Sequence, residues 1–287
     1  MLASAEYPPR LRDLERPPEV VHVTGELPRG HAAAIVGTRE PTSEAEAFAY
    51  ELARGLADRD VVVYSGGALG IDTAAHRGAL ASGGRTVVVA PSSFDCPFPE
   101  ENGSLFEQIV EGGGAFLTTH PPGTPAARHH FFARNHVLAA LVDVLVMVES
   151  RYRGGARNAL KAARRLGRKV LVVPGSPWNP KASGCLLEIR NGAPLATSVD
   201  DVLIALGLPK RAGAAPVRPA RRSVFLEGQD PDRFSVLAAL ENGSIDVDAL
   251  CQATGLGAAR VQAMLLTLTL EGIVVSGPSG RVSLVSV

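Results

Sequence analysis

The sequence predicts an α/β protein in which a parallel sheet is covered by helices on both faces and is followed by a small winged helix. Strand-like runs alternate with helix-length segments along residues 31–206. These runs are apolar throughout rather than alternately polar, which is typical of parallel strands buried on both faces. Residues 227–287 contain three helix-length runs and then two short apolar runs that flank Gly277-Pro278-Ser279-Gly280, which predicts a hairpin.

Apolar runs predict the strands, because glycine, proline or polar residues bound each run. The predicted strands are residues 20–23, 32–36, 61–64, 86–90, 115–119, 143–148 and 169–173, with hairpin strands at 273–276 and 282–285. Helix-length runs between them predict the helices. These are residues 71–82, 104–110, 156–166, 186–190, 199–206, 231–240, 246–253 and 257–271, and residues 120–133 are predicted to be a basic loop.

One more helix is predicted from residue 43, after the first apolar strand. Ser43 and Glu46 have the spacing of a capping box. Phe48, Leu52 and Leu56 then recur every four residues, so they should form the buried face of that helix.

Composition excludes several classes of protein. The 287 residues are 46% hydrophobic, enough for a core, and no apolar run is long enough to span a bilayer. The N-terminus lacks the basic and then apolar pattern of a signal peptide, and the three cysteines, Cys96, Cys185 and Cys251, lack CxxC spacing. We therefore expect a reducing, cytoplasmic setting, no structural metal site and no cofactor.

Charge is balanced overall but unevenly distributed. Residues 128–169 hold 10 bases and 2 acids, a net charge of +8, whereas residues 40–111 hold 4 bases and 12 acids, a net charge of −8. Residues 207–226 add five bases without an acid, and residues 227–287 hold 3 bases and 7 acids, a net charge of −4. A neutral total can therefore contain a basic surface for a polyanion, although a single basic run is also common on a solvated helix.

Ligands of parallel sheets bind beyond the carboxyl ends of the strands. The turn Ser65-Gly66-Gly67, with Gly70, lies between a strand and a helix, an order that favours phosphate binding by backbone N–H groups. A tight turn without a ligand explains the same residues equally well. Arg39 follows Gly37 at another strand end, where an anion would lie between it and the Ser65 turn.

A second candidate site interleaves cations with aromatic rings. It contains Arg128, His129, His130, Phe131, Phe132, Arg134, Asn135 and His136. This pattern suits a single-stranded nucleic acid, because cations follow the phosphates and rings stack on bases at about 1–3 kcal/mol per base. The alternative is that the phenylalanines anchor the loop in the core, which we expect for one of the two.

A hydrolytic triad is not expected. Ser65 lacks the Gly-x-Ser-x-Gly setting of a nucleophile elbow. Asp72 and His76 are four residues apart on one helix, a spacing that favours a local hydrogen bond. We therefore predict a binding protein rather than an enzyme.

Together these motifs resemble the DNA-processing protein A (DprA) family over about residues 7–206. They are Gly37-Thr38-Arg39, Ser65 to Asp72 with His76 and Gly78-Ala79-Leu80, Asp95 with Pro99 and Asn102, Phe131 before Arg134-Asn135, Pro174-Gly175, Gly184-Cys185 and Gly192-Ala193. The resemblance implies an extended Rossmann-like domain that binds single-stranded DNA. It also implies a homodimer that loads RecA during natural transformation.

The DNA-binding residues expected from the patterns and the resemblance are Gly37, Thr38, Arg39, Ser65, Gly66, Gly67, Gly70, Arg128, Phe131, Arg134, Asn135 and His136. The sequence departs from the family at three places. His136 replaces an arginine, which should weaken one phosphate contact and make it sensitive to pH. Thr119-His120 replaces Ser-Glu, and Arg153-Gly154-Gly155-Ala156 replaces Ser-Gly-Ser with a later Thr-Ala.

We divide the chain into a proline-rich lead-in (1–30), an extended Rossmann-like domain that binds single-stranded DNA (31–206), a linker of alanine, proline and arginine (207–226) and a winged helix (227–287). The winged helix is acidic, and Arg260 is the only base on its third helix. Reading duplex DNA needs a cationic face, so we assign this domain to protein contact or packing.

Two other functions are weighed against this prediction. Nucleotide phosphoribohydrolases of the lysine-decarboxylase-like group share the sheet, but their Pro-Gly-Gly-x-Gly-Thr-x-x-Glu motif reads Pro174-Gly175-Ser176-Pro177 here, without the glutamate. A winged-helix transcription regulator with a ligand-sensing sheet domain is disfavoured by the acidic C-terminal segment.

Overall fold

The computed structural model describes residues 7–209, 231–240, 246–270, 273–276 and 281–284. These residues belong to two compact units, Met1–Pro219 and Ala220–Val287. The basic residues of the predicted linker and the hairpin turn at 277–280 lie outside the described residues. Within the described part, no helix is long and apolar enough to cross a membrane.

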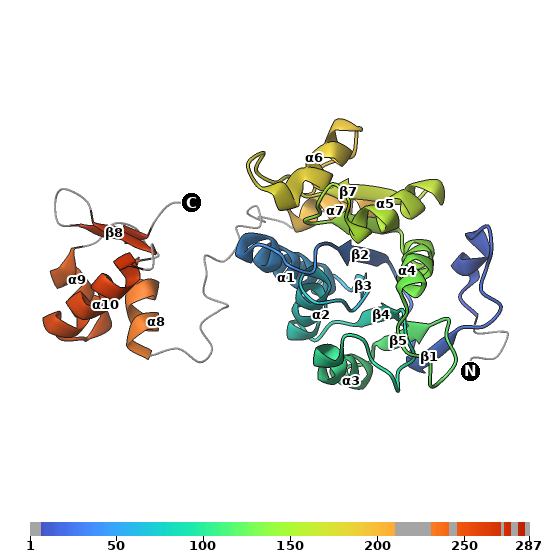
Figure 1. Ribbon diagram of the computed structural model, residues 1–287, viewed down its shortest axis with the longest axis horizontal. Helices are drawn as coiled ribbons and strands as arrows, with labels where there is room; N and C mark the ends of the chain where they lie inside the picture. The colour runs from blue at the N-terminus through green and yellow to red at the C-terminus, as the bar shows by residue number, and fades with distance from the viewer. Residues whose placement is uncertain (1–6, 210–230, 241–245, 271–272, 277–280, 285–287) are drawn as a thin grey trace. The chain divides into compact units, whose positions relative to one another are not determined.

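A seven-stranded sheet with the order β1-β5-β4-β3-β2-β6-β7 organises the first unit (Figure 1). Its strands are β1 (His22–Gly25), β2 (Ala32–Val36), β3 (Val62–Ser65), β4 (Thr86–Ala90), β5 (Ala115–Thr118), β6 (Val144–Met147) and β7 (Lys169–Val172). Strands β2 to β7 are parallel, and β1 pairs antiparallel with β5. The predicted α/β sheet is confirmed, with an antiparallel edge strand added to it.

Helices cover both faces of this sheet, as predicted (Figure 1). One face is covered by α1 (Ser43–Ala57), α2 (Ile71–Ala81), α3 (Gly103–Glu111) and α7 (Val199–Leu206). The other face is covered by α4 (Arg128–Leu141), α5 (Gly155–Arg165) and α6 (Ser183–Arg190). The predicted stripe of α1 is fully buried, with Leu52 and Leu56 at 0% exposure, and each such side chain stabilises the fold by about 1.5–3 kcal/mol.

The predicted capping box of α1 is wrong. The helix is capped by Thr42, whose hydroxyl accepts a hydrogen bond from the Ala45 N–H at 3.2 Å. Thr42 is held in place because its own N–H donates to the carboxylate of Glu149, 2.9 Å away. A residue 107 positions along the chain therefore decides where the helix begins.

The predicted loop at 120–133 is wrong in its second half, because α4 begins at Arg128. Val137, Leu138 and Leu141 of this helix pack in the core, but Arg134, one turn earlier on the same side, is buried as well. A charged residue thus stands where a helical pattern needs an apolar one. The N-cap residue Ala127 also provides no side-chain cap, so neither a cap nor an apolar stripe marks the start of this helix in the sequence.

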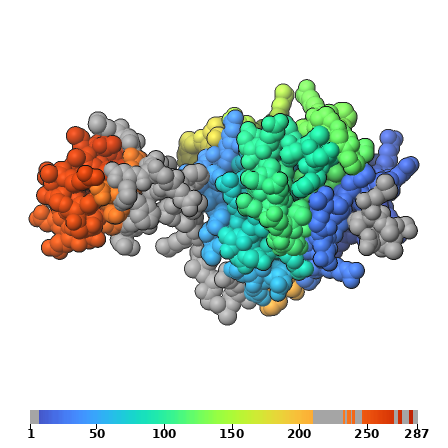
Figure 2. All heavy atoms as spheres, turned by 90° about the horizontal axis from the view of Figure 1, so that it is seen from below, coloured from blue at the N-terminus to red at the C-terminus, as the bar shows by residue number. Residues whose placement is uncertain are grey.

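The proline-rich lead-in packs on the first unit rather than extending from it (blue in Figure 2). Leu11 is fully buried against the α4 face of the sheet. Arg10 forms an ion pair of 2.5 Å with Asp143, whose carboxylate also accepts the Ala32 N–H at 2.9 Å. These contacts of the lead-in therefore stabilise the starts of β2 and β6.

The second unit is a winged helix, as predicted. It consists of α8 (Pro231–Leu240), α9 (Val247–Thr254), α10 (Ala258–Leu270) and the antiparallel pair β8 (Val274–Ser276) and β9 (Val282–Leu284). Val236, Leu250, Val261 and Leu268 form its core. Arg260, the only base of α10, forms an ion pair with Asp232 of α8.

Candidate nucleic-acid interface

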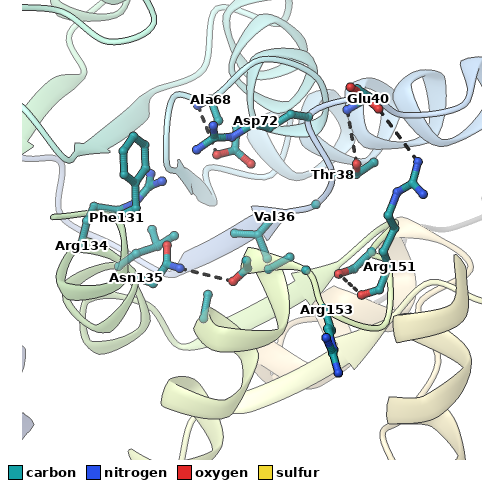
Figure 3. A pocket seen from close by; sticks show the side chains of 18 residues that line it. Val36, Thr38, Glu40, Ala68, Asp72, Phe131, Arg134, Asn135, Arg151 and Arg153 are labelled. Carbon is teal, nitrogen blue, oxygen red and sulfur yellow. Dashed lines mark hydrogen bonds and ion pairs between the residues drawn. The ribbon is translucent and has the colours of Figure 1, made fainter. Parts of the chain in front are cut away.

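The strand order reverses between β2 and β6. From β2 the chain builds β3, β4 and β5 on one side, and it then returns to build β6 and β7 on the other. Open parallel sheets bind ligands at the carboxyl ends of the strands beside such a reversal. A pocket of about 330 Å³ opens at that point, between the segment after β2, the segment after β6 and α4 (Figure 3).

The pocket is lined by more cations than acids. The charged lining residues are Arg39, Arg134, Arg151 and Arg153, with Glu40 and Asp72. Arg151 lies 4.0 Å from Glu40, and both side chains are exposed. In Figure 3, Phe131, Arg134 and Asn135 approach from α4, and Arg151 and Arg153 approach from the opposite side. The balance of charge favours an anionic ligand.

Arg39 and Phe131 meet at the pocket. The guanidinium carbon of Arg39 lies 4.9 Å from the centre of the Phe131 ring, a cation–π contact, and Arg39 itself is exposed. Phe131 also packs against the ring of Phe98 in an edge-on contact, with ring centres 5.5 Å apart. The pair therefore presents an exposed cation beside an aromatic ring whose position is fixed.

The backbone beneath Arg39 is also fixed. The Thr38 N–H donates to the carbonyl oxygen of Glu149 at 2.7 Å, and the Thr38 carbonyl accepts the Ile71 N–H at 3.2 Å. Gly37 is required here, because a Cβ atom would lie 2.5 Å from the side chain of Ile71. The exit of β2 is thereby joined to the exit of β6 and to the start of α2.

Arg134 is buried at the base of the pocket, with 7% of its surface exposed. Its Nη1 atom donates to the carbonyl oxygen of Val89 at 2.9 Å. Its pKa is lowered by burial, raised by the Asp72 carboxylate and lowered again by Arg39. A Cβ atom on Gly66 would lie 1.6 Å from the Arg134 guanidinium, so the glycine at this position makes room for the arginine.

The backbone N–H groups of the glycine turn already donate to a side chain of the protein. Asp72 accepts hydrogen bonds from the backbone N–H groups of Gly66, at 3.2 Å, and Ala68, at 3.3 Å. Burial raises the pKa of this carboxyl group, while Arg134 and the two N–H groups lower it. Gly67 is buried against Phe106, and the Ser65 hydroxyl donates to the carbonyl of Ile35 at 2.6 Å. The turn therefore already holds an anion, the carboxylate of Asp72.

His76 does not form the expected local hydrogen bond with Asp72. Its Nδ1 atom lies 2.8 Å from the hydroxyl of Thr86, which donates its own proton to Val63. His76 Nδ1 therefore carries a proton and donates, and Nε2 has no hydrogen-bond partner among the described residues. Burial lowers the pKa of His76 to about 3, with a further contribution from Arg134, so the ring is neutral.

Two of the three arginines of α5 form ion pairs within the fold. Arg157 and Arg164 both form ion pairs with Glu188 of α6, at 2.8 and 2.7 Å, and Glu188 is only 1% exposed. Arg168 pairs with Asp13 of the lead-in at 2.5 Å. Within the part of the chain that the structure describes, Arg39, Arg128 and Arg153 take part in no ion pair.

Six of the predicted binding residues line the pocket together: Gly37, Thr38, Arg39, Phe131, Arg134 and Asn135. The glycine-turn residues lie beneath it, and Arg128 and His136 lie on α4 outside its lining. Sequence reasoning missed the segment after β6, of which Ser150, Arg151 and residues 153–156 line the pocket. The signal was Gly154-Gly155 at the start of α5, which has no side-chain cap and directs backbone N–H groups outward.

Comparison with known proteins gives consistent matches. Residues 1–207 match the family model for DNA recombination-mediator protein A, and residues 214–280 match the DprA winged helix domain. A putative DNA processing protein DprA of Mycobacterium tuberculosis is 41% identical over 84% of this chain and 61% of its own length. Protein Smf of Synechocystis is 30% identical over 96% of this chain and 77% of its own length. The chain thus spans about three fifths of the length of the Mycobacterium relative.

Two solved structures share the fold. The X-ray structure of DNA processing protein A from Streptococcus pneumoniae has a TM-score of 0.64 and 32% identity, and the match covers 69% of this chain and 70% of that one. A structure of the Helicobacter pylori protein, which concerns its binding of single-stranded DNA, has a TM-score of 0.63 and 26% identity. That match covers 69% of this chain and 92% of the other.

Proposed function

This chain belongs to the DNA recombination-mediator protein A family, and on that premise we propose that it binds single-stranded DNA at the pocket between β2 and β6. The observation that carries the proposal is the contact between Arg39 and Phe131. It places an exposed cation beside a braced aromatic ring at the point where the strand order reverses. A phosphate and its adjacent base need this pair of groups.

Different residues of the pocket contact different parts of the bound strand. Arg39 binds a phosphate, and the uncapped N-terminus of α5 at Gly154-Gly155 offers N–H groups and positive potential to the next one. Phe131 stacks on a base, and Arg128, one turn earlier on α4, follows the backbone outward. Asn135 donates to the Gly155 carbonyl at 3.3 Å and so keeps α4 and α5 in register.

The buried residues act as support for this surface. Arg134 supplies positive potential from beneath, because it is buried and donates to Val89. Ser65, Gly66, Gly67 and Gly70 shape the turn that carries Asp72, and we assign them a positioning role rather than direct phosphate contact. His136 lies on α4 outside the pocket lining, and we assign it no direct contact there.

The test is charge reversal at Arg39. Arg39→Glu should weaken binding of a fluorescent thymidine strand well beyond tenfold at moderate salt, because it replaces a phosphate contact by repulsion. Fluorescence anisotropy measures the affinity, and Arg165→Glu on the exposed end of α5 is the matched control. Equal affinities for Arg39→Glu and the unchanged protein would remove Arg39 from the site.

Strand and duplex are compared at two salt concentrations. A single strand should bind more tightly than a duplex of equal length, because only unpaired bases can stack on Phe131. Affinity should fall steeply with salt, since each phosphate contact contributes about −0.7 to the logarithmic slope for single strands. Equal binding of the duplex would instead favour a groove-reading protein.

The proposed protein partners follow from membership of the family. We propose that the protein acts as a homodimer that protects incoming single strands and transfers them to RecA during natural transformation, without catalysis of its own. Its effect on RecA filament formation on coated strands is the direct measurement. Release of adenine from AMP would revive the phosphoribohydrolase alternative, against which Ser176-Pro177 stands where that motif continues with Gly-x-Gly-Thr.

A further inference from the structure

Trp178 is the most exposed large hydrophobic side chain among the described residues, at 89%. It is also the only tryptophan of the chain. A tryptophan is highly buried in most proteins, and exposed aromatic groups in a fixed loop are typical of a surface that binds a partner. The proposed pocket does not include this residue, so its exposure needs a separate account.

The loop that carries Trp178 is held firmly. The next residue, Asn179, donates through Nδ2 to the Glu149 carboxylate at 2.7 Å and accepts the Lys181 N–H at 2.9 Å. The Gly184 N–H donates to the Ser150 carbonyl at 2.7 Å. The segment after β7 is therefore joined to the segment after β6, which lines the pocket.

Tyr152 lies on that neighbouring segment and is also exposed, at 58%. Its N–H donates to the Ser183 hydroxyl at 3.0 Å, and the guanidinium of Arg157 lies 5.2 Å from its ring centre. Tyr152 stands between Arg151 and Arg153, which both line the pocket. Figure 3 shows Arg153 directed away from Thr38 and Glu40. The cationic lining therefore continues from the pocket onto the outer surface.

The three aromatic groups belong to segments at the exits of adjacent strands. β2, β6 and β7 are adjacent and parallel, and neighbouring strands lie about 4.8 Å apart. The ring of Phe131 stands beside the exit of β2, Tyr152 follows β6, and Trp178 follows β7. Arg153 and Lys181 lie on the segments after β6 and β7 and form no ion pair among the described residues, so they add positive potential to these segments.

We propose that Tyr152 and Trp178 form a second stacking surface, which holds the bases of a single strand as it leaves the pocket toward β7. This inference rests on the proposed function, since it extends the same strand. The two exposed rings, together with the unpaired cations Arg153 and Lys181, favour a polyanion with unpaired bases over a protein partner. Exposed rings beside cations bind any base, because every base offers a face to stack on.

The test uses the fluorescence of Trp178, which reports on this position alone. A thymidine strand of about 20 nucleotides, longer than the pocket, should quench it, whereas a strand of about 4 nucleotides that fills the pocket should not. Trp178→Ala should weaken binding of the long strand by about 5- to 100-fold, the loss expected for one stacked base, and leave the short strand unaffected. Trp178→Phe should restore most of the affinity.

The controls separate this inference from the proposed function. Leu266→Ala removes another exposed side chain, on α10, and should change neither affinity nor fluorescence; circular dichroism confirms folding of each variant. If the long strand binds in an Arg39-dependent way but neither quenches Trp178 nor responds to Trp178→Ala, the second surface is refuted while the proposed function stands. If the unchanged protein binds neither strand, the proposed function itself fails.

Discussion

Two basic helices, α4 and α5, lie on the same face of the sheet, but their arginines have different surroundings. Arg134 of α4 is buried beside Asp72 at the pocket, and Arg128 is exposed without an ion pair among the described residues. Arg157 and Arg164 of α5 are bound to Glu188, a residue of α6. The helix with fewer cations, α4, therefore carries the proposed binding surface, whereas two arginines of the more basic α5 form structural ion pairs.

The difference teaches that a charge count locates a basic region but not a binding site. Residues 128–169 carry a net charge of +8, yet three of the ten bases are paired to acids outside that run. Arg157 and Arg164 pair with Glu188, and Arg168 pairs with Asp13 of the lead-in. Acids far away in sequence decide which cations are available.

The largest effect is expected on the α4 side. Arg134→Met removes the charge that faces the buried Asp72 and leaves the Val89 carbonyl without its partner, so it should destabilise the protein by about 3–5 kcal/mol. Urea denaturation measures the free energy of unfolding. Arg165→Met, on the exposed end of α5, is the control and should change it by less than about 0.5 kcal/mol. A loss below about 1 kcal/mol for Arg134→Met would show that Asp72 does not need this charge.

Glu188→Gln tests the α5 side. It leaves two partly buried guanidinium groups without their carboxylate, so it should destabilise the protein by about 3 kcal/mol, again measured with urea. The affinity of this variant for single-stranded DNA should stay within about twofold of that of the unchanged protein, because Arg157 and Arg164 stabilise the fold and do not contact the DNA. A large gain in affinity would break the comparison, since it would mean that these arginines bind DNA once they are released.

The smallest expected effect is the change in the free energy of unfolding with pH that His76 of α2 causes. His76 has a folded-state pKa of about 3 and an ordinary unfolded value near 6.5, so only the unfolded chain takes up a proton between these values. Its contribution to stability is complete above pH 6.5 and is lost as the pH falls, by about 2 kcal/mol between pH 7 and pH 5.

Denaturation at both pH values measures this loss. His76→Asn retains a side-chain N–H for Thr86 but does not titrate, so its stability should depend less on pH over the same range. The exposed His31→Asn is the matched control and should leave the pH dependence of the parent protein unchanged. An equal pH dependence in His76→Asn would assign the effect to other groups.

Part of the site was predictable from sequence. The motif Gly37-Thr38-Arg39 and the pair Phe131 and Arg134 come from segments far apart in the chain, and the structure brings them to one pocket. The segment 150–156 was not predicted, because no local pattern says that the exit of β6 lies beside the exit of β2.

The sequence by itself determined the strands and the buried face of α1. Short apolar runs bounded by glycine, proline or polar residues, such as Ala32–Val36 and Thr86–Ala90, predicted buried strands, and their bounds agree with the structure residue by residue. Only the tertiary structure decided that Thr42 caps α1, that α4 begins at Arg128, that Asp72 fills the glycine turn and that Glu188 pairs with Arg157 and Arg164. The physical reason is that burial patterns are local, whereas the partner of a charge or of an N–H group is chosen by proximity in space.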